Sequence, residues 1–207
     1  MKKLIIAPHV DDEVLGCGGV IDSQTFVVHC GLADNQNHGN NFFSKNHRLL
    51  EWETVKQEVG CNSKLLDNTV NSFQCSHLIG DLEKAINDHC PDIAYIPSPS
   101  YNQDHQEAYK ACIVAFRPHD INFFVKKIVM YEQPQDFWDG ARGASFKIDP
   151  NYFVPIDINK KIKLYKMLES QVRNHRSPDM LINLAKMRGH QSNCEFAEAF
   201  QILRWVD

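Results

Sequence analysis

Residues 7–13 read APHVDDE, and this acidic stretch joins a short apolar run to a glycine-containing one. The apolar run, residues 4–7 (LIIA), has no charged side chain and predicts a buried strand over residues 3–7. Residues 14–19 (VLGCGG) come next, and we expect a helix over residues 14–23 whose glycines allow close packing on the sheet. The order strand, acidic loop, helix is the first unit of an α/β fold.

Apolar strands and helical patterns alternate along the rest of the chain. Ser44 is a suitable N-cap for a helix that ends at Gly60, whereas residues 34–41 are too rich in Asn and Gly to predict regular structure. Residues 197–206 fit a helix and a strand equally well. Further strands are expected at residues 25–30, 63–66, 92–96 and 127–131, further helices at 77–89, 104 to about 117, 157–172 and after 178, and an irregular segment at 133–151.

This alternation predicts an α/β fold with a mostly parallel sheet and helices on both faces, Rossmann-like, in a single domain that spans residues 1–207. In such sheets ligands bind outside the carboxyl ends of the strands. Two chemically distinctive stretches, residues 8–13 and 97–105, each follow a predicted strand. We therefore expect both stretches to lie at one edge of the sheet and to form one site.

Composition excludes several classes of protein. The net charge of −4 argues against a nucleic-acid partner, and no apolar run approaches the ~20 residues of a membrane span. The apolar run at residues 4–7 is too short for the core of a signal peptide, so we expect a cytoplasmic protein. The seven cysteines are odd in number and form no Cys-x-x-Cys pair, which argues against a disulfide framework and a zinc ribbon.

His9 and Asp12 are candidate ligands of a divalent metal, and Asp11 between them is free to move a proton. Imidazole nitrogen and carboxylate oxygen suit zinc, which takes three protein ligands and a water in catalytic sites. Two alternatives stay open: the acids could merely cap the helix, or residues 16–19 (GCGG) could form a dinucleotide-binding turn. Three consecutive acids exceed what a cap needs, however, and they would repel a pyrophosphate.

Asp104 and His105 are the second half of the predicted site. Asp104 can cap the helix that follows, while His105 projects from the first turn toward the loop edge. A lone histidine is most often a solvated or hydrogen-bonded residue. His105 becomes a candidate ligand because its loop is expected at the same sheet edge as His9 and Asp12.

These residues carry a family resemblance. APHVDDE resembles the signature His-Pro-Asp-Asp-Glu of the LmbE/PIG-L-type zinc-dependent N-acetylglucosaminyl deacetylases. The likeness continues through GCGG, Arg48-x-x-Glu51 and Asp104-His105, and late in the chain through Arg188-Gly189 and the run AEAF at residues 197–200. The resemblance implies that His9, Asp12 and His105 bind one Zn²⁺, with Fe²⁺ or Co²⁺ as alternatives, and that Asp11 is the general base.

Two positions depart from the family pattern. Val10 replaces the usual proline, which should affect the stiffness of the loop more than its chemistry. Asn102 stands where many members carry a second histidine, three residues before the metal-binding one, so a histidine acid cannot be carried over. Arg48 is expected to bind substrate hydroxyls or to brace the acidic loop, and Trp138 to stack on a sugar ring or to join the core.

We therefore expect a metal-dependent hydrolase that removes an N-acyl group, foremost N-acetyl, from an amino-sugar or sugar conjugate. Arg48, Asn102 and Trp138 are the expected substrate-binding residues, and residues 34–41 and 133–143 the expected roof of the pocket. The alternatives are a zinc amidase for a different small amide and a metal-loaded binding protein without turnover. The sequence leaves the sugar, the proton donor and a homo-oligomeric state open.

Overall fold

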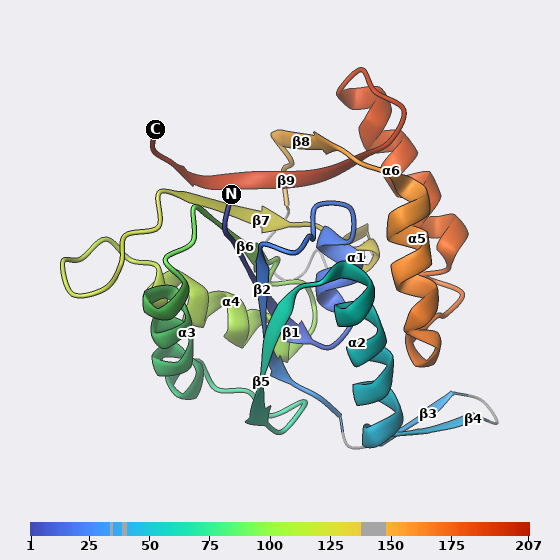
Figure 1. Ribbon diagram of the computed structural model, residues 1–207, viewed down its shortest axis with the longest axis horizontal. Coiled ribbons are helices and arrows are strands. Elements are labelled where there is room, and N and C mark those ends of the chain that lie inside the picture. The colour runs from blue at the N-terminus through green and yellow to red at the C-terminus, as the bar shows by residue number, and fades with distance from the viewer. Residues whose placement is uncertain (34, 39–40, 138–147) are drawn as a thin grey trace.

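The computed structural model describes residues 1–33, 35–38, 41–137 and 148–207. A seven-stranded sheet runs through it in the order β5-β2-β1-β6-β7-β9-β8, and a separate two-stranded hairpin, β3-β4, lies beside the N-terminal end of α2 (Figure 1). The strands of the sheet are β1 (Lys3–His9), β2 (Thr25–Gly31), β5 (Asn62–Asn68), β6 (Ile93–Pro97), β7 (Lys127–Tyr131), β8 (Tyr152–Pro155) and β9 (Ala197–Trp205). The five strands from β5 to β7 are parallel, and β9 is antiparallel to both β7 and β8.

Helices cover both faces of the sheet (Figure 1). Strand β1 sends Ile5 and Ala7 into one apolar core and Leu4 and Ile6 into the other, as the two-residue period of a strand requires. The first core lies under α1, α2, α5 and α6, and the second under α3 and α4. The helices are α1 (Asp12–Cys17), α2 (Lys45–Val59), α3 (Cys75–His89), α4 (Gln103–Ala115), α5 (Ile158–Met167) and α6 (Pro178–Gln191).

The mostly parallel sheet confirms the predicted fold class. From β1 the chain moves outward to β2 and β5, and it then returns to the other side of β1 to add β6 and β7. The direction of winding therefore reverses between β1 and β6, and α/β sheets bind their ligands outside the carboxyl ends of the strands at such a switch point. His9 ends β1 and the loop to α4 follows β6, so the topology places both predicted stretches at this position.

Several predicted boundaries were wrong. The first helix ends at Cys17 instead of residue 23, and the backbone N–H groups of Gly19 and Val20 donate to the Glu198 carboxylate instead of continuing a helix. The predicted loop at residues 34–41 overlaps the antiparallel pair β3 (Asn35–His38) and β4 (Asn41–Ser44), in which strand pairing overrides the low propensity of asparagine. The helix predicted to reach residue 172 ends at Met167, and a 3₁₀ turn, Glu169–Gln171, follows it.

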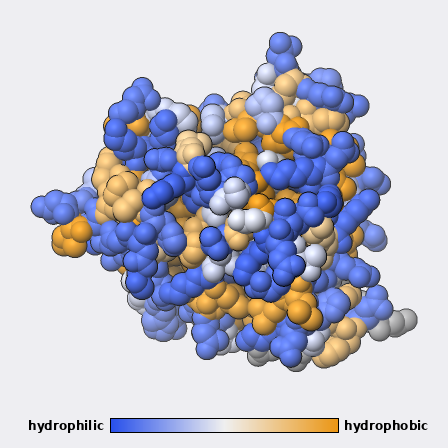
Figure 2. Space-filling model, viewed as in Figure 1, coloured by the Kyte–Doolittle hydropathy of each residue, from blue (hydrophilic) through white to orange (hydrophobic). Residues whose placement is uncertain are grey.

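The segment at residues 197–206, which fits a helix and a strand equally well by its sequence, has a clear structure. Residues 197–205 form β9, because β7 and β8 offer hydrogen-bonding edges on both of its sides. In the predicted irregular segment, Pro134–Phe137 forms a 3₁₀ turn, whereas β8 begins at Tyr152. Within the described parts of the chain, no helix is long and apolar enough to cross a membrane. The face drawn in Figure 2 is largely hydrophilic, with apolar groups in separate patches.

Candidate functional site

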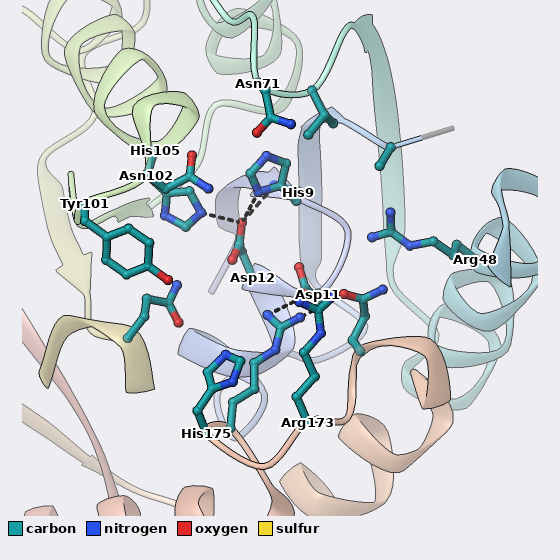
Figure 3. A pocket seen from close by; sticks show the side chains of 15 residues that line it. His9, Asp11, Asp12, Arg48, Asn71, Tyr101, Asn102, His105, Arg173 and His175 are labelled. Atoms are coloured by element: carbon teal, nitrogen blue, oxygen red, sulfur yellow. Dashed lines mark hydrogen bonds and ion pairs between the residues drawn. The ribbon is translucent and has the colours of Figure 1, made fainter. Parts of the chain in front are cut away.

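A cavity of about 330 Å³ opens at the carboxyl ends of β1 and β6 (Figure 3). His9, Asp11, Asp12 and His105 line it together, so side chains from residues about 95 positions apart in the sequence lie in one cavity. Its volume is at the low end of the roughly 300–1,000 Å³ that is typical of small-molecule sites. The lining is rich in charged and polar side chains, which suits a hydrophilic ligand.

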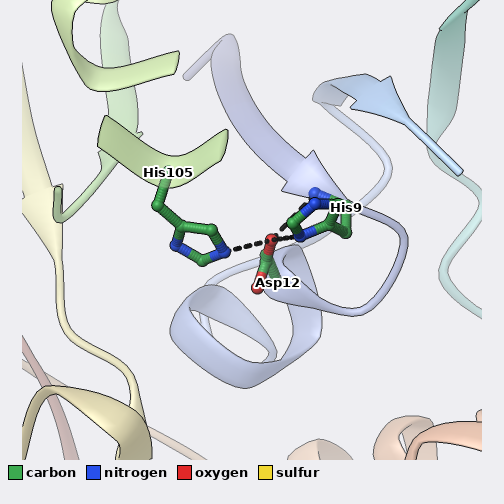
Figure 4. A group of neighbouring side chains, drawn as sticks. All are labelled: His9, Asp12 and His105. Atoms are coloured by element: carbon green, nitrogen blue, oxygen red, sulfur yellow. Dashed lines mark hydrogen bonds and ion pairs between the residues drawn. The ribbon is translucent and has the colours of Figure 1, made fainter. Parts of the chain in front are cut away.

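His9, Asp12 and His105 form a compact cluster of possible metal ligands (Figure 4). The Asp12 Oδ2 atom lies 3.5 Å from His9 Nδ1 and 3.3 Å from His105 Nε2. Tetrahedral zinc with bonds of ~2.0–2.1 Å holds neighbouring ligand atoms roughly 3.3 Å apart. The chemistry of the three donors and the two distances to Asp12 therefore fit one divalent ion, which His9, Asp12 and His105 would hold.

A second carboxylate orients the His9 ring. His9 Nε2 lies 2.9 Å from Asp104 Oδ2, and a proton held on Nε2 leaves the Nδ1 lone pair for a metal. Asp104 is itself fixed, because it accepts hydrogen bonds from the backbone N–H groups of Asn71 and Phe73 at 2.6 and 3.2 Å. Burial alone would lower the pKa of His9, but its hydrogen bonds to Asp104 and Asp12 raise that pKa to about 9.

This role of Asp104 corrects the prediction that it caps α4. Asn102 is the N-cap, and its side-chain oxygen accepts a hydrogen bond from the Asp104 backbone N–H at 2.8 Å. The residue expected only to touch substrate therefore also starts the helix that carries His105. Since the oxygen of Asn102 is used in this way, its amide NH₂ remains the group that can donate to a ligand.

Asp12 is held from two sides. Its Oδ2 accepts from the His9 backbone N–H at 2.8 Å, and its Oδ1 accepts from the Gln133 side-chain amide at 2.9 Å. Burial opposes ionisation, but the imidazoles of His105 and His9 hold the pKa of the Asp12 carboxyl well below its usual range. Asp12 is thus a negatively charged donor with a fixed orientation, as a metal ligand requires.

Asp11 lies at the same edge but makes different contacts. Its backbone adopts a φ of 150°, which residues other than glycine rarely adopt, and its N–H donates to Glu13 Oε2 at 3.1 Å. Glu13 also contacts the buried His29 ring at 3.0 Å. The Asp11 carboxylate accepts from Arg176 Nη1 at 2.8 Å. Among the described residues, an ion pair with Arg176 holds the carboxylate that is predicted to be the base, and no histidine of the cluster contacts it.

The three residues that were predicted to bind substrate differ in their location. Arg48 and Asn102 line the cavity, and the Arg48 Nη2 atom lies 3.4 Å from the Val10 carbonyl oxygen, which also supports the bracing role. Trp138 lies outside the described residues, as does most of the predicted roof at residues 133–143. Residues 34 and 39–40 of the other predicted roof segment lie outside them too.

Sequence reasoning missed the wall of the cavity formed by Gln171, Arg173, His175 and Arg176. These residues follow α5, at the end of the 3₁₀ turn and in the irregular segment after it, and they form no known motif. The run RNHR at residues 173–176 was the available signal, since two arginines and a histidine within four residues are an unusual charge density beside a predicted helix end. Gln133 begins the predicted roof at residues 133–143, but its hydrogen bond to Asp12 was not expected, because a single glutamine carries no pattern.

Comparisons with known proteins agree with this arrangement. The model of the PIG-L family, described as GlcNAc-PI de-N-acetylase, matches residues 4–116, which is more than half of the chain. No curated protein sequence matches the chain. The family match contains every residue of the metal-ligand cluster and Asp11, whereas the segment that carries Arg173 and Arg176 lies beyond it.

Solved structures share the fold at low sequence identity. N,N'-diacetylchitobiose deacetylase from Pyrococcus horikoshii has a TM-score of 0.76 and 21% identity, over 98% of this chain and 84% of its own. The conserved protein TT1542 from Thermus thermophilus has a TM-score of 0.79 and 18% identity, over 100% and 96% of the two chains. GalB, a 4-carboxy-2-hydroxymuconate hydratase from Pseudomonas putida KT2440, has a TM-score of 0.76 and 18% identity, over 100% of this chain and 99% of its own.

The three structures show that the fold extends over the whole chain, and their different titles show that the fold alone does not determine the reaction. The family model adds what the fold cannot, because it matches the segment with the acidic loop and the Asp104–His105 pair. The resemblance seen in the sequence is thereby confirmed: the chain belongs to the PIG-L (LmbE) family.

Proposed function

We propose that the protein is a metal-dependent hydrolase that removes an N-acyl group, foremost N-acetyl, from an amino-sugar or sugar conjugate. One observation carries the proposal: three metal-ligand donors and a separately held carboxylate, Asp11, face the same polar cavity. The description of the family and the deacetylase titles of several structural neighbours support it. Zinc is the proposed ion, and a neighbouring fold is titled as the zinc-inhibited form of teicoplanin deacetylase Orf2.

The residues divide the chemistry between them. A divalent ion held by His9, Asp12 and His105 would supply Lewis acidity, polarising the amide carbonyl and making water a better nucleophile at neutral pH. Asp11 takes the proton of the attacking water, since its carboxylate lines the cavity beside the cluster but is not among the three converging ligand atoms. Arg176 keeps that carboxylate in one orientation through the 2.8 Å ion pair.

The leaving amine must receive a proton before the C–N bond breaks. Asn102 cannot donate a titratable proton. His175 lines the cavity, but burial and the charges of Arg176 and Arg173 lower its pKa, so it is mostly neutral near pH 7 and a weak source of protons. We therefore propose that Asp11 passes on the proton that it has taken up, first as base and then as acid.

Acetate release from a panel of N-acetyl amino-sugars and simple N-acetyl amides, measured with the Zn²⁺-loaded protein, tests the function. The proposal expects turnover of at least one amino-sugar, and loss of that turnover in Asp11→Asn. Turnover of simple amides alone would favour the amidase alternative. Ligand binding without acetate release from any compound would favour a binding protein and overturn the hydrolase.

A further inference from the structure

Glu13 is the third acid of the stretch at residues 7–13, and the proposed mechanism gives it no role. Its side chain is fully buried and is not among those that line the cavity, so it does not face a substrate. The carboxylate turns back toward the residue that precedes α1, and its Oε2 atom accepts a hydrogen bond from the Asp11 backbone N–H at 3.1 Å. Glu13 therefore acts on the backbone of the residue that is proposed to be the base.

The backbone of Asp11 is strained. Its φ is 150° and its ψ is −26°, a conformation that residues with a side chain rarely adopt. The other non-glycine residues with positive φ in the described chain have φ values of 45–67°, close to the ordinary left-handed region. A strained conformation persists only where its surroundings restrain it. The hydrogen bond from the Asp11 N–H to Glu13 is such a restraint, and the Asp11 side chain that leaves this backbone lines the cavity (Figure 3).

His29 holds the Glu13 carboxylate from the neighbouring strand. It lies in β2, in register with Ala7 of β1, and it is fully buried. Its Nε2 atom lies 3.0 Å from Glu13 Oε2, the oxygen that also accepts from Asp11. The His29 ring packs edge-on against Trp52, with 4.6 Å between the ring centroids. The rigid sheet thereby determines where Glu13 Oε2 lies, and with it the position of the Asp11 peptide.

This buried pair is unfavourable for stability alone. Glu13 Oε1 and His29 Nδ1 are buried, and neither atom has a hydrogen-bond partner among the described residues. Unpaired buried polar atoms cost free energy, and two well-packed apolar side chains of similar volume would avoid that cost. An apolar pair could not, however, accept a hydrogen bond from the Asp11 N–H. The contact with Asp11 is thus what the polar pair supplies.

We propose that Glu13 and His29 are positioning residues for the general base, which hold the Asp11 backbone in its strained conformation and so keep the Asp11 carboxylate in the cavity. Arg176 restrains the carboxylate itself, whereas Glu13 restrains the backbone that carries it. The inference rests on the proposed function, in which Asp11 takes the proton of water, and deepens it. Without the acceptor the Asp11 peptide relaxes toward an ordinary φ, and a misplacement of about 1 Å can cost roughly 10²-fold in rate.

Hydrogen exchange tests the contact without requiring turnover. Glu13→Met keeps the length of the side chain but removes the acceptor oxygen, so exchange of the Asp11 amide, followed by NMR of the Zn²⁺-loaded protein, should become at least tenfold faster. The Ile5 amide in the middle of β1 is the internal reference for global opening. Glu13→Gln keeps an acceptor oxygen and should change the Asp11 rate by less than threefold. His29→Leu should accelerate it about fivefold, and it tests the contact even if Glu13→Met fails to fold.

Kinetics test the consequence for the base. With any amino-sugar that the protein deacetylates, Glu13→Met should lower kcat about 30-fold, with Zn²⁺ content unchanged and KM within threefold, and Glu13→Gln should retain most of the rate. In protein that already carries Asp11→Asn, adding Glu13→Met should lower the residual rate by less than threefold, because no base is left to position. A merely structural role of Glu13 would instead lower both rates by the same factor.

Glu198→Gln is the matched control. Glu198 is also a buried carboxylate that accepts from backbone N–H groups, those of Gly19 and Val20 just after the other end of α1, and it does not line the cavity. This variant should lower Tm and change kcat by less than threefold. Full kcat in folded Glu13→Met, equal losses with and without Asp11→Asn, or unchanged Asp11 exchange in the folded Glu13 and His29 variants would overturn the positioning role.

The two proposals fail separately. Faster exchange of the Asp11 amide in Glu13→Met, without acetate release from any substrate by the unsubstituted protein, would keep the restraint on Asp11 and refute the hydrolase. Acetate release by the unsubstituted protein, with the same kcat in Glu13→Met, would keep the hydrolase and refute the positioning role.

Discussion

His9 and Asp12 on one side of the cavity and Arg48 on the other differ in how completely their hydrogen bonds are formed. On the metal-ligand wall, His9 and Asp12 each have fixed partners, Asp104 for the ring and Gln133 for the carboxylate. On the side of the cavity formed by α2, Arg48 keeps two donor atoms without partners among the described residues. A site that must hold an ion in one geometry benefits from preorganised ligands. A site that selects a substrate needs hydrogen-bond donors that are free to bind that substrate. We therefore expect His9 and Asp12 to serve the chemistry and Arg48 to serve the choice of substrate within one small cavity.

The largest effect is expected from variants that remove a metal ligand. His9→Ala and His105→Ala should each remove almost all bound metal, because two ligands cannot hold the ion against water. Elemental analysis of the purified variants measures this, with His190→Ala, an exposed position on α6, as the control. Full metal occupancy in either variant would show that the cluster is not the metal site.

The next effect separates the two neighbouring acids. Asp12→Asn should lose metal, since the ligand charge disappears, whereas Asp11→Asn should keep the metal and lose about 10³-fold in kcat, within the 10²–10⁴-fold range of general acid–base catalysis. Metal content and acetate release, measured on the same samples, check both expectations. If Asp11→Asn loses the metal and Asp12→Asn retains it, the two roles are exchanged.

Removing the metal should make stability sensitive to pH. The folded-state pKa of His9 is about 9, above its ordinary value of 6.5, so protonated His9 stabilises the metal-free fold fully below pH ~6.5. This contribution, on the order of 3 kcal/mol, is lost as the pH rises through about 9. Urea unfolding of chelator-treated protein at pH 6.5 and 9.5 measures it.

Two controls belong to this experiment. His9→Gln should not show the loss, and neither should the metal-loaded protein, in which a ligated His9 carries no extra proton. A metal-free protein that is equally stable at both pH values would mean that the contacts of His9 with Asp104 and Asp12 do not favour its charged form.

Arg176 links the segment at residues 173–176 to the acidic loop, because its guanidinium forms an ion pair with Asp11. Arg176→Gln should lower kcat by roughly 10- to 100-fold with unchanged metal content, since a charged hydrogen bond of about 1.5–3 kcal/mol orients the base. Arg176→Lys should restore part of the rate, and Arg173→Gln should change KM more than kcat. An unchanged kcat in Arg176→Gln would show that the ion pair is only structural.

The smallest effect is expected at Asn102. Loss of one neutral hydrogen bond to the substrate, roughly 0.5–1.5 kcal/mol, should reduce kcat by about tenfold in Asn102→Ala. That variant also loses the N-cap of α4, which costs about 1 kcal/mol of stability, so Asn102→Ser serves as a control that keeps a capping oxygen. A loss as large as that of Asp11→Asn, with metal retained, would contradict the single-carboxylate mechanism and direct the search for the acid to His175.

The sequence by itself determined the sheet, its parallel character and the pair of stretches that meet at its edge. Apolar periodicity decides which segments become buried strands, and in parallel sheets the carboxyl ends of those strands must share one side. The sequence therefore predicts that His9, Asp12 and His105 lie together at one edge of the sheet. The fold brings them together because His9 is the last residue of β1 and Asp12 and His105 lie in the first turns of α1 and α4, where backbone geometry fixes the direction of the side chain.

Only the tertiary structure decided the partners of these residues. Asp104 as the support of His9, Gln133 as the support of Asp12 and Arg176 as the partner of Asp11 are contacts over more than 90 residues of sequence. Two of the three partners come from irregular segments, whose path depends on packing and not on a periodic pattern. Hydrogen bonds between distant side chains carry no local signature, so only the folded chain shows that Arg173 and Arg176 line the cavity.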